Sequence, residues 1–123
     1  MAEAAGRRPR PARRLAELRA RYLRELPARV GALAECARRV GLQPHRTSVE
    51  AVYLLSHKLA GSSAIYGCHA VSGPAVLLET LLREVLDGER PLARGVEREL
   101  EELITELEQA VLSETGSAPL RRV

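Results

Sequence analysis

The residue best suited to chemistry is His57, which lies in a stretch from Leu54 to Gly67 that reads as one helix. At about 100° per residue, the core face of this helix is predicted to be a stripe of Ser48, Val52, Leu55, Leu59, Ser63 and Tyr66. His57 falls roughly opposite that stripe, so its imidazole is expected to face solvent, where a neutral ring nitrogen can act as a nucleophile. Gly61 shares its face. A glycine inside a helix costs about 1 kcal/mol relative to alanine, so Gly61 suggests room for a bulky partner.

The residues from His57 to Gly67, His-Lys-Leu-Ala-Gly-Ser-Ser-Ala-Ile-Tyr-Gly, resemble the signature of histidine-containing phosphotransfer (HPt) domains. That signature has a phospho-accepting histidine, an apolar residue, a glycine four positions on, a small residue and a second glycine that closes the helix. The resemblance continues at Leu78 and Glu79, which match the Leu-Glu position of the next helix. It covers roughly residues 11–112, and its specific part is 54–79. Many members have a lysine three residues after the histidine; this chain has Ala60 there.

The resemblance implies a phosphorelay intermediate. His57 would attack an aspartyl phosphate on a response-regulator receiver domain through one ring nitrogen, Nε2, and would then pass the phosphoryl group to a second receiver. Mg²⁺ and the other catalytic groups would belong to the receiver, so the chain would need no cofactor or metal of its own. It would be a phosphohistidine carrier and not an autonomous kinase. Its partners would be receiver domains and a sensor (hybrid) histidine kinase.

Four residues are assigned supporting roles. Lys58, the only lysine, is a candidate to stabilise phosphoryl charge, and Gly61 permits close approach. Ser62 could hydrogen-bond within the helix or toward the site. Glu79 is placed near the histidine by the family pattern and could orient its other nitrogen. Three of them also have a structural explanation: Lys58 as a solvated lysine, Ser62 as a packing serine and Glu79 as a solvent-facing carboxylate. The expected partner-binding residues are Tyr53, Leu54, Ala60, Ala64 and Ile65.

The predicted elements are all helices. Apolar periodicity runs from Pro11 to Val40 but is interrupted by Pro27, which predicts one kinked helix or two helices. A capping box from Thr47 to Glu50 would begin the His57 helix and Gly67 would end it. Because of Pro74, the next helix should start late, near Ser72, or be distorted there, and Pro91 should lie in the first turn of the last helix. We expect an antiparallel up-down-up-down four-helix bundle with an additional or kinked N-terminal helix.

The 123 residues suit one domain, predicted over 11–112, with flexible tails at 1–10 and 113–123. No apolar run is long enough for a signal peptide or a membrane span. The two cysteines are far apart in the sequence, which favours a reducing cytoplasm. The net charge of +3 comes mostly from arginines spread over tails and helix faces, so we expect solvated surfaces and no nucleic-acid partner. No dimer seam is evident, and a monomer is expected.

Three other interpretations stay open. The chain could be an HPt-like docking module that binds a receiver or kinase without phosphotransfer. It could be a small basic protein that binds nucleic acid through its Arg-rich first segment, with steep salt dependence. Cys68 and His69 could contribute to a zinc site, although their spacing fits no standard pattern. Without the surrounding motif, His57 would be interpreted as an ordinary surface histidine.

Overall fold

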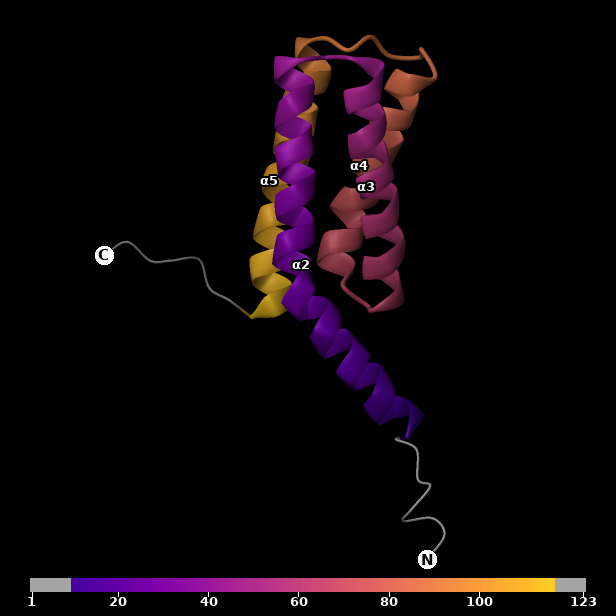
Figure 1. Ribbon diagram of the computed structural model, residues 1–123, viewed down its shortest axis with the longest axis vertical. Coiled ribbons are helices and arrows are strands. Elements are labelled where there is room, and N and C mark those ends of the chain that lie inside the picture. Colours follow the sequence, from indigo (N-terminus) through magenta and orange to yellow (C-terminus); the bar gives the residue numbers. More distant parts are fainter. Residues whose placement is uncertain (1–9, 117–123) are drawn as a thin grey trace, which may run out of the picture.

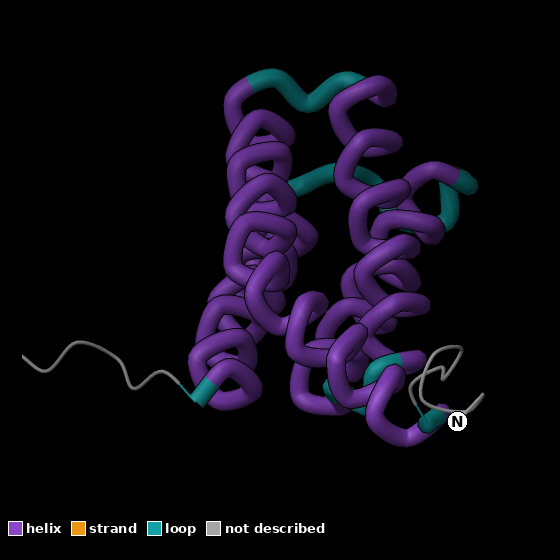
Figure 2. Tube along the Cα trace, turned by 60° about the horizontal axis from the view of Figure 1, so that its bottom comes forward, coloured by secondary structure: helices purple, strands orange, loops and turns teal. Residues whose placement is uncertain are grey.

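The computed structural model describes residues 10–116, and four helices make up most of this part (Figure 1). They are α2 (Pro11–Leu42), α3 (Arg46–Ile65), α4 (His69–Leu86) and α5 (Arg94–Thr115). Short loops join them, and no strand occurs between residues 10 and 116 (Figure 2). The tails expected at 1–10 and 113–123 lie largely outside the described residues. Residues 113–115 do not belong to a tail, because α5 continues to Thr115 before Gly116 ends it with φ of 73°.

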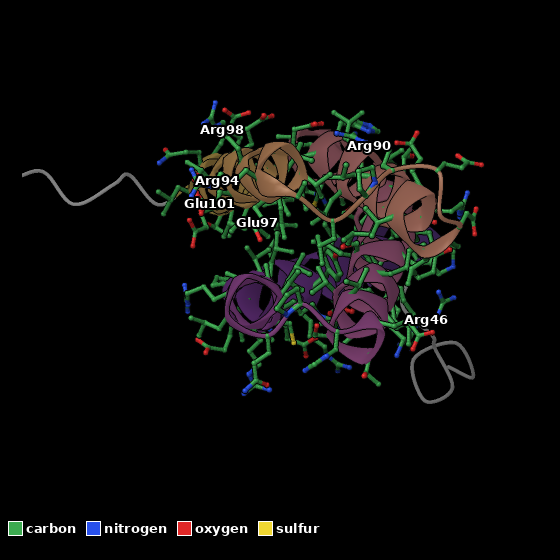
Figure 3. All side chains as sticks on the ribbon, turned by 90° about the horizontal axis from the view of Figure 1, so that it is seen from above. Arg46, Arg90, Arg94, Glu97, Arg98 and Glu101 are labelled. Atoms are coloured by element: carbon green, nitrogen blue, oxygen red, sulfur yellow. The ribbon has the colours of Figure 1, made fainter. Side chains whose placement is uncertain are left out.

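The helices form an antiparallel four-helix bundle in which the chain passes from corner to corner. α2 packs against α3 and α5, and α4 packs against the same two helices. Seen from above, each helix therefore occupies one corner of the bundle (Figure 3). This confirms the predicted all-α, up-down-up-down architecture. It also separates the surface between α3 and α4 from the surface between α2 and α5, which lies on the opposite side.

The N-terminal region is one long helix and not two. Pro27 lies inside α2 on an exposed position, where the ring and the missing N–H disturb only the solvent side of the helix. The N-terminal part of α2 leans away from the bundle (Figure 1), and the buried residues of α2 begin only at Tyr22. The prediction of a separate additional helix is therefore wrong, and the alternative of a single helix containing Pro27 is confirmed.

The core consists of aliphatic side chains from all four helices. Its largest fully buried members are Leu26, Leu33, Leu78, Leu82 and Leu107. Each fully buried leucine contributes about 1.5–3 kcal/mol relative to an exposed one. The buried residues of α3 are Leu59 and five smaller side chains: Val49, Val52, Ser56, Ala60 and Ser63. The largest fully buried side chains of the bundle therefore come from α2, α4 and α5.

The buried face of α3 matches the predicted stripe only in part. Val52, Leu59 and Ser63 are buried as predicted, whereas the buried Val49, Ser56 and Ala60 lie outside the stripe. Ser56 and Ser63 are fully buried, and each hydroxyl donates to a carbonyl four residues earlier, at 2.7 Å to Val52 and 2.6 Å to Leu59. These bonds satisfy the hydroxyls, so burying them leaves no polar group without a partner. Leu55 is only half-buried. The inward face is therefore rotated toward Ser56 and Ala60, which the apolar pattern alone did not indicate.

Several helix starts differ from the predictions. α3 begins at Arg46, and its first turn is closed by a bond from the His45 N–H to Ser48 Oγ at 3.1 Å, not by a Thr47–Glu50 box. Gly67, with φ of 72°, follows the end of α3 as expected. α5 begins at Arg94, so Pro91 lies in the preceding loop and not in a first turn.

α4 begins at His69, three residues before the expected start near Ser72. Its first turn is capped from another helix, because the Ala70 N–H donates to Glu114 Oε2 of α5 at 3.2 Å. The Cys68 carbonyl accepts from Val71 and Ser72. With its first N–H groups satisfied, the helix forms despite Pro74, which then falls inside it and costs one backbone bond.

Candidate functional site

His57 projects from the middle of α3 and is paired with a carboxylate of α4. Its side chain is 61% exposed, whereas that of Glu79 is only 14% exposed. The two are joined by a hydrogen bond of 2.8 Å between His57 Nδ1 and Glu79 Oε2. The expected exposure of the imidazole is confirmed. The bond turns an otherwise mobile surface ring into one with a defined orientation.

The Glu79 contact distinguishes the two ring nitrogens of His57. An ionised carboxylate can only accept hydrogen bonds, so a neutral imidazole beside it carries its proton on Nδ1. Nε2 then keeps its lone pair. A carboxylate on Nδ1 also stabilises positive charge that develops on the ring when Nε2 reacts with an electrophile, as in other carboxylate–histidine pairs. The pair is therefore suited to nucleophilic chemistry at Nε2.

Two further side chains complete the group, which we call the His57 cluster: Tyr53, His57, Glu79 and Arg83. Arg83 Nη2 donates to Glu79 Oε2 at 3.0 Å and to the Tyr53 hydroxyl at 3.0 Å. The Tyr53 ring lies nearly parallel to the imidazole, with 19° between planes and 6.2 Å between centroids. The pKa of Arg83 is raised above its ordinary value, first by the hydrogen bond to Tyr53 and then by nearby charges that include Glu79.

Helical spacing explains how four residues from two helices meet. Tyr53 and His57 are one turn apart on α3, and Glu79 and Arg83 are one turn apart on α4, so each pair lies on one helix face. α3 and α4 are antiparallel neighbours, which sets Tyr53 opposite Arg83 and His57 opposite Glu79. The sequence prediction included all of these residues except Arg83. Its position one turn after Glu79 is the signal that could have identified it.

The other proposed supporting residues lie in different environments. Lys58 is exposed. Ser62 does not point toward His57, because its hydroxyl shares a 2.7 Å hydrogen bond with the Tyr22 hydroxyl of α2. Burial raises the pKa of Tyr22, which keeps this phenol protonated. Ser62 thus joins α3 to α2.

The glycine beside the cluster faces open space. A Cβ built on Gly61 would have no atom of another part of the chain within 4 Å. The fold itself therefore does not require a glycine here. Ala60, by contrast, is only 7% exposed, so its assignment to a partner-binding surface is wrong. Ala60 lies one turn after Ser56, so it is on the same inward face of α3 and is buried with it.

Exposed apolar side chains surround the cluster. Leu54 is 55% exposed and Ile65 is 74% exposed. Ala64, which lies one turn after Gly61 on the same helix, is also exposed. Val76 of α4, which the sequence did not single out, is 48% exposed and lies one turn before Glu79. Together they give the α3–α4 surface an apolar border around a polar centre, a composition typical of protein-binding surfaces.

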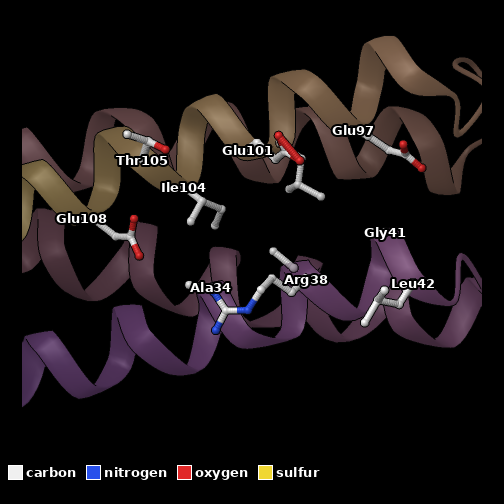
Figure 4. Close-up of a pocket in the computed structure, with 11 residues that line it drawn as sticks. Ala34, Arg38, Gly41, Leu42, Glu97, Glu101, Ile104, Thr105 and Glu108 are labelled. Carbon is white, nitrogen blue, oxygen red and sulfur yellow. The ribbon is translucent and has the colours of Figure 1, made fainter.

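A groove of about 580 Å³ lies between α2 and α5, on the opposite side of the bundle (Figure 4). Ala34, Ala37, Leu100 and Ile104 form its apolar floor, and all four are buried. Glu97, Glu101 and Glu108 line its α5 side, facing Arg38 of α2. No histidine or cysteine lines it. It offers no nucleophile comparable with His57.

Residues 10–116 contain neither a cluster of metal-binding side chains nor a helix that could span a membrane. No group of three or more His, Cys, Asp and Glu side chains in this range is arranged to hold a metal ion. Cys68 is buried and His69 is exposed, so they do not face a common site. Within the same range, none of the helices has the length and apolar character needed to cross a membrane.

The sequence matches a known domain family. The model of the Hpt domain family matches residues 17–110, which includes parts of α2 and α5 and all of the His57 cluster. Neither the curated proteins nor the solved structures contain a match to this chain. The family match covers more than half of the 123 residues.

Proposed function

This chain belongs to the Hpt domain family, and we propose that it is a phosphorelay intermediate that carries a phosphoryl group on His57. The group would arrive from an aspartyl phosphate on one receiver domain and leave to the aspartate of another. A sensor or hybrid histidine kinase would stand upstream. The observation that carries this proposal is the 2.8 Å bond from His57 Nδ1 to Glu79, because it leaves Nε2 as the nucleophilic nitrogen of an exposed imidazole.

The proposed step conserves atoms and charge. The Nε2 lone pair attacks the phosphorus in line, the bond between phosphorus and the aspartyl oxygen breaks, and its electron pair returns to the aspartate as a carboxylate. The ring then carries a positive charge and keeps its Nδ1 proton, which Glu79 holds. In the onward step a second aspartate attacks phosphorus, and the electron pair of the N–P bond returns to Nε2.

The receiver supplies the rest of the catalytic machinery in this proposal. Mg²⁺ bound by the receiver would offset charge on the phosphoryl oxygens. The bundle contributes the nucleophile, its orientation and an accessible surface. Leu54, Ile65 and Val76 border that surface and would contact the receiver, while Gly61 would permit its close approach. Cys36 and Cys68 are both free thiols, which suits a reducing cytoplasm.

The test is phosphoryl transfer from a panel of radiolabelled receiver domains and labelled hybrid kinases to the wild-type chain and to His57→Gln. We expect label on the wild type alone, stable to alkali and labile to acid, as a phosphoramidate bond should be. His45→Gln is the matched control, because it removes a different exposed histidine. If a receiver binds the wild type but transfers no label, the chain is a docking module and the proposed phosphotransfer is wrong.

A further inference from the structure

The contacts of Arg83 suggest a part in the chemistry although it lies outside the family signature. It touches both groups that contact the imidazole: the carboxylate that accepts from Nδ1 and the tyrosine whose ring lies beside it. Its guanidinium also lies 5.7 Å from the centre of the Tyr53 ring. The guanidinium of Arg83 thus holds two neighbours of His57 in place, Glu79 through one hydrogen bond and Tyr53 through another.

The geometry at Glu79 is specific. His57 Nδ1 and Arg83 Nη2 donate to the same oxygen, Oε2, at 2.8 and 3.0 Å. Without Arg83, the carboxylate could turn about its last torsion and present either oxygen, or move toward solvent, because that torsion is broad in glutamate. With the guanidinium bound to Oε2 and anchored on Tyr53, the acceptor for Nδ1 stays in one place. Charge-assisted bonds of this kind are the stronger ones in proteins.

Two other residues near His57, Ala60 and Lys58, are less suited to this role than Arg83. The position three residues after His57 is Ala60, which is buried and carries no charge. Lys58 follows His57 directly, about 100° around the helix, and so does not share the His57–Glu79 face. Arg83 reaches the site from α4 on the same helix face as Glu79.

We propose that Arg83 is a positioning residue for phosphotransfer: by bridging Glu79 and Tyr53, it holds His57 with its proton on Nδ1 and its lone pair on Nε2. This inference rests on the proposed function only where it predicts a slower phosphorylation of His57. The orientation and tautomer of the ring can be measured without any phosphoryl donor. Arg83 acts through Glu79 and Tyr53 and needs no contact with the phosphoryl group.

The test compares wild type with Arg83→Gln, Arg83→Lys and Tyr53→Phe. Arg83→Gln removes the charge, Arg83→Lys keeps it without the planar guanidinium, and Tyr53→Phe keeps the ring but removes the hydroxyl that Arg83 binds. Arg38→Gln is the control, because it removes an exposed arginine that pairs with Glu35 on its own helix. Since both arginines are exposed, all variants should fold, which circular dichroism would check.

Two readouts are used. The first is the protonation of each His57 ring nitrogen, from ¹⁵N NMR of the imidazole. The second is the rate of His57 labelling by phosphoramidate, a small donor that needs no receiver. We expect Arg83→Gln to shift the proton population from Nδ1 toward Nε2 and to slow labelling about tenfold, the lower end of the losses that follow when hydrogen-bond partners of metal-bound histidines are removed. Arg83→Lys should be intermediate, Tyr53→Phe mildly affected, and Arg38→Gln unchanged.

The outcomes separate the inference from the proposed function. An unchanged tautomer in Arg83→Gln would overturn the positioning role, whatever the wild type does with phosphoramidate. A changed tautomer together with slower labelling would establish it. Failure of the wild type to accept label from phosphoramidate and from every receiver would contradict the proposed function, while the NMR result would still decide whether Arg83 orients the ring.

Discussion

The two opposite faces of the bundle use charged residues in different ways. On the α3–α4 face, Glu79 and Arg83 of α4 bind His57 and Tyr53 of α3, so the polar contacts cross between helices. On the α2–α5 face, acidic residues are more numerous and the ion pairs are scattered: Arg38, which lines the groove, pairs with Glu35 of its own helix, and Arg19 of α2 pairs with Glu114 of α5 away from the groove. Figure 4 shows Glu97, Glu101 and Glu108 spaced along α5 and not gathered around one point.

This difference shows that the density of charge does not identify a functional site. Exposed ion pairs contribute about 0–1 kcal/mol each, so neither face owes much stability to them. What distinguishes the α3–α4 face is that its polar groups converge on one nucleophile and define the orientation of that nucleophile. If this interpretation is correct, substitutions on the α3–α4 face should affect phosphotransfer strongly, and substitutions on the α2–α5 face should not.

The largest effect short of removing His57 is expected for Glu79→Ala. Loss of the carboxylate removes the acceptor for Nδ1, and labelling by phosphoramidate should fall about 10- to 100-fold. Glu79→Gln should lie between this variant and wild type, because its amide oxygen still accepts a hydrogen bond. Glu106→Ala, on an exposed position of α5, is the control. Equal rates for Glu79→Ala and Glu106→Ala would remove the distinction between the faces.

The next effect concerns docking. Leu54→Ser and Ile65→Ser should each raise, by about tenfold, the receiver concentration needed for half-maximal transfer, because contact residues at a protein interface can each contribute more than 1 kcal/mol. Labelling by phosphoramidate should not change, since that donor needs no surface. Leu42→Ser is the matched control, as Leu42 is 82% exposed at the end of α2. A loss of receiver transfer in Leu42→Ser of similar size would show that docking is not confined to the α3–α4 face.

A smaller effect is expected for Gly61→Ala. The added methyl group meets no atom of another part of the chain, so the variant should be more stable by up to about 1 kcal/mol in thermal or denaturant unfolding. Transfer from a receiver should slow several-fold, while labelling by phosphoramidate stays the same. Gly31→Ala in α2 should give the same gain in stability with no change in transfer. If both variants transfer at the wild-type rate, Gly61 is not reserved for a partner.

Substitutions in the groove between α2 and α5 are expected to have no effect on phosphotransfer. The double variant Glu101→Gln, Glu108→Gln removes two acidic groups that line it and should leave both transfer and phosphoramidate labelling within error of wild type. Steady-state transfer from the same receiver is the measurement. A loss of transfer comparable with that of Leu54→Ser would assign the α2–α5 face a part in receiver binding.

Much of the fold could be predicted because its information is local. Apolar periodicity indicated the helices, and the arithmetic of about 100° per residue was enough to place His57 on an exposed face. The proximity of Glu79 to His57 came from the family resemblance, since nothing in the spacing of the two residues along the chain indicates that they meet. Glu79 and His57 are 22 residues apart.

Two of the errors arose where distant parts of the chain act on each other. The start of α4 was placed too late because its first turn is capped by Glu114, which lies 44 residues from Ala70. The buried face of α3 was misjudged in part for a local reason: Ser56, whose hydroxyl bonds to the Val52 carbonyl of its own helix, is buried like an apolar residue, and Ala60 is buried one turn after it. Arg83 was missed because, among many arginines, only the packing of α4 on α3 brings it to Tyr53.

The most direct test of the central claim is to identify the phosphorylated atom. Wild-type chain labelled with ¹⁵N would be phosphorylated by its receiver or by phosphoramidate, and NMR coupling between phosphorus and the ring nitrogens would locate the new bond. Because Glu79 occupies the Nδ1 side of His57, we predict a phosphoryl group on Nε2 of this residue. Phosphorus on Nδ1 of His57, or on His45 or His69 instead, would contradict the account.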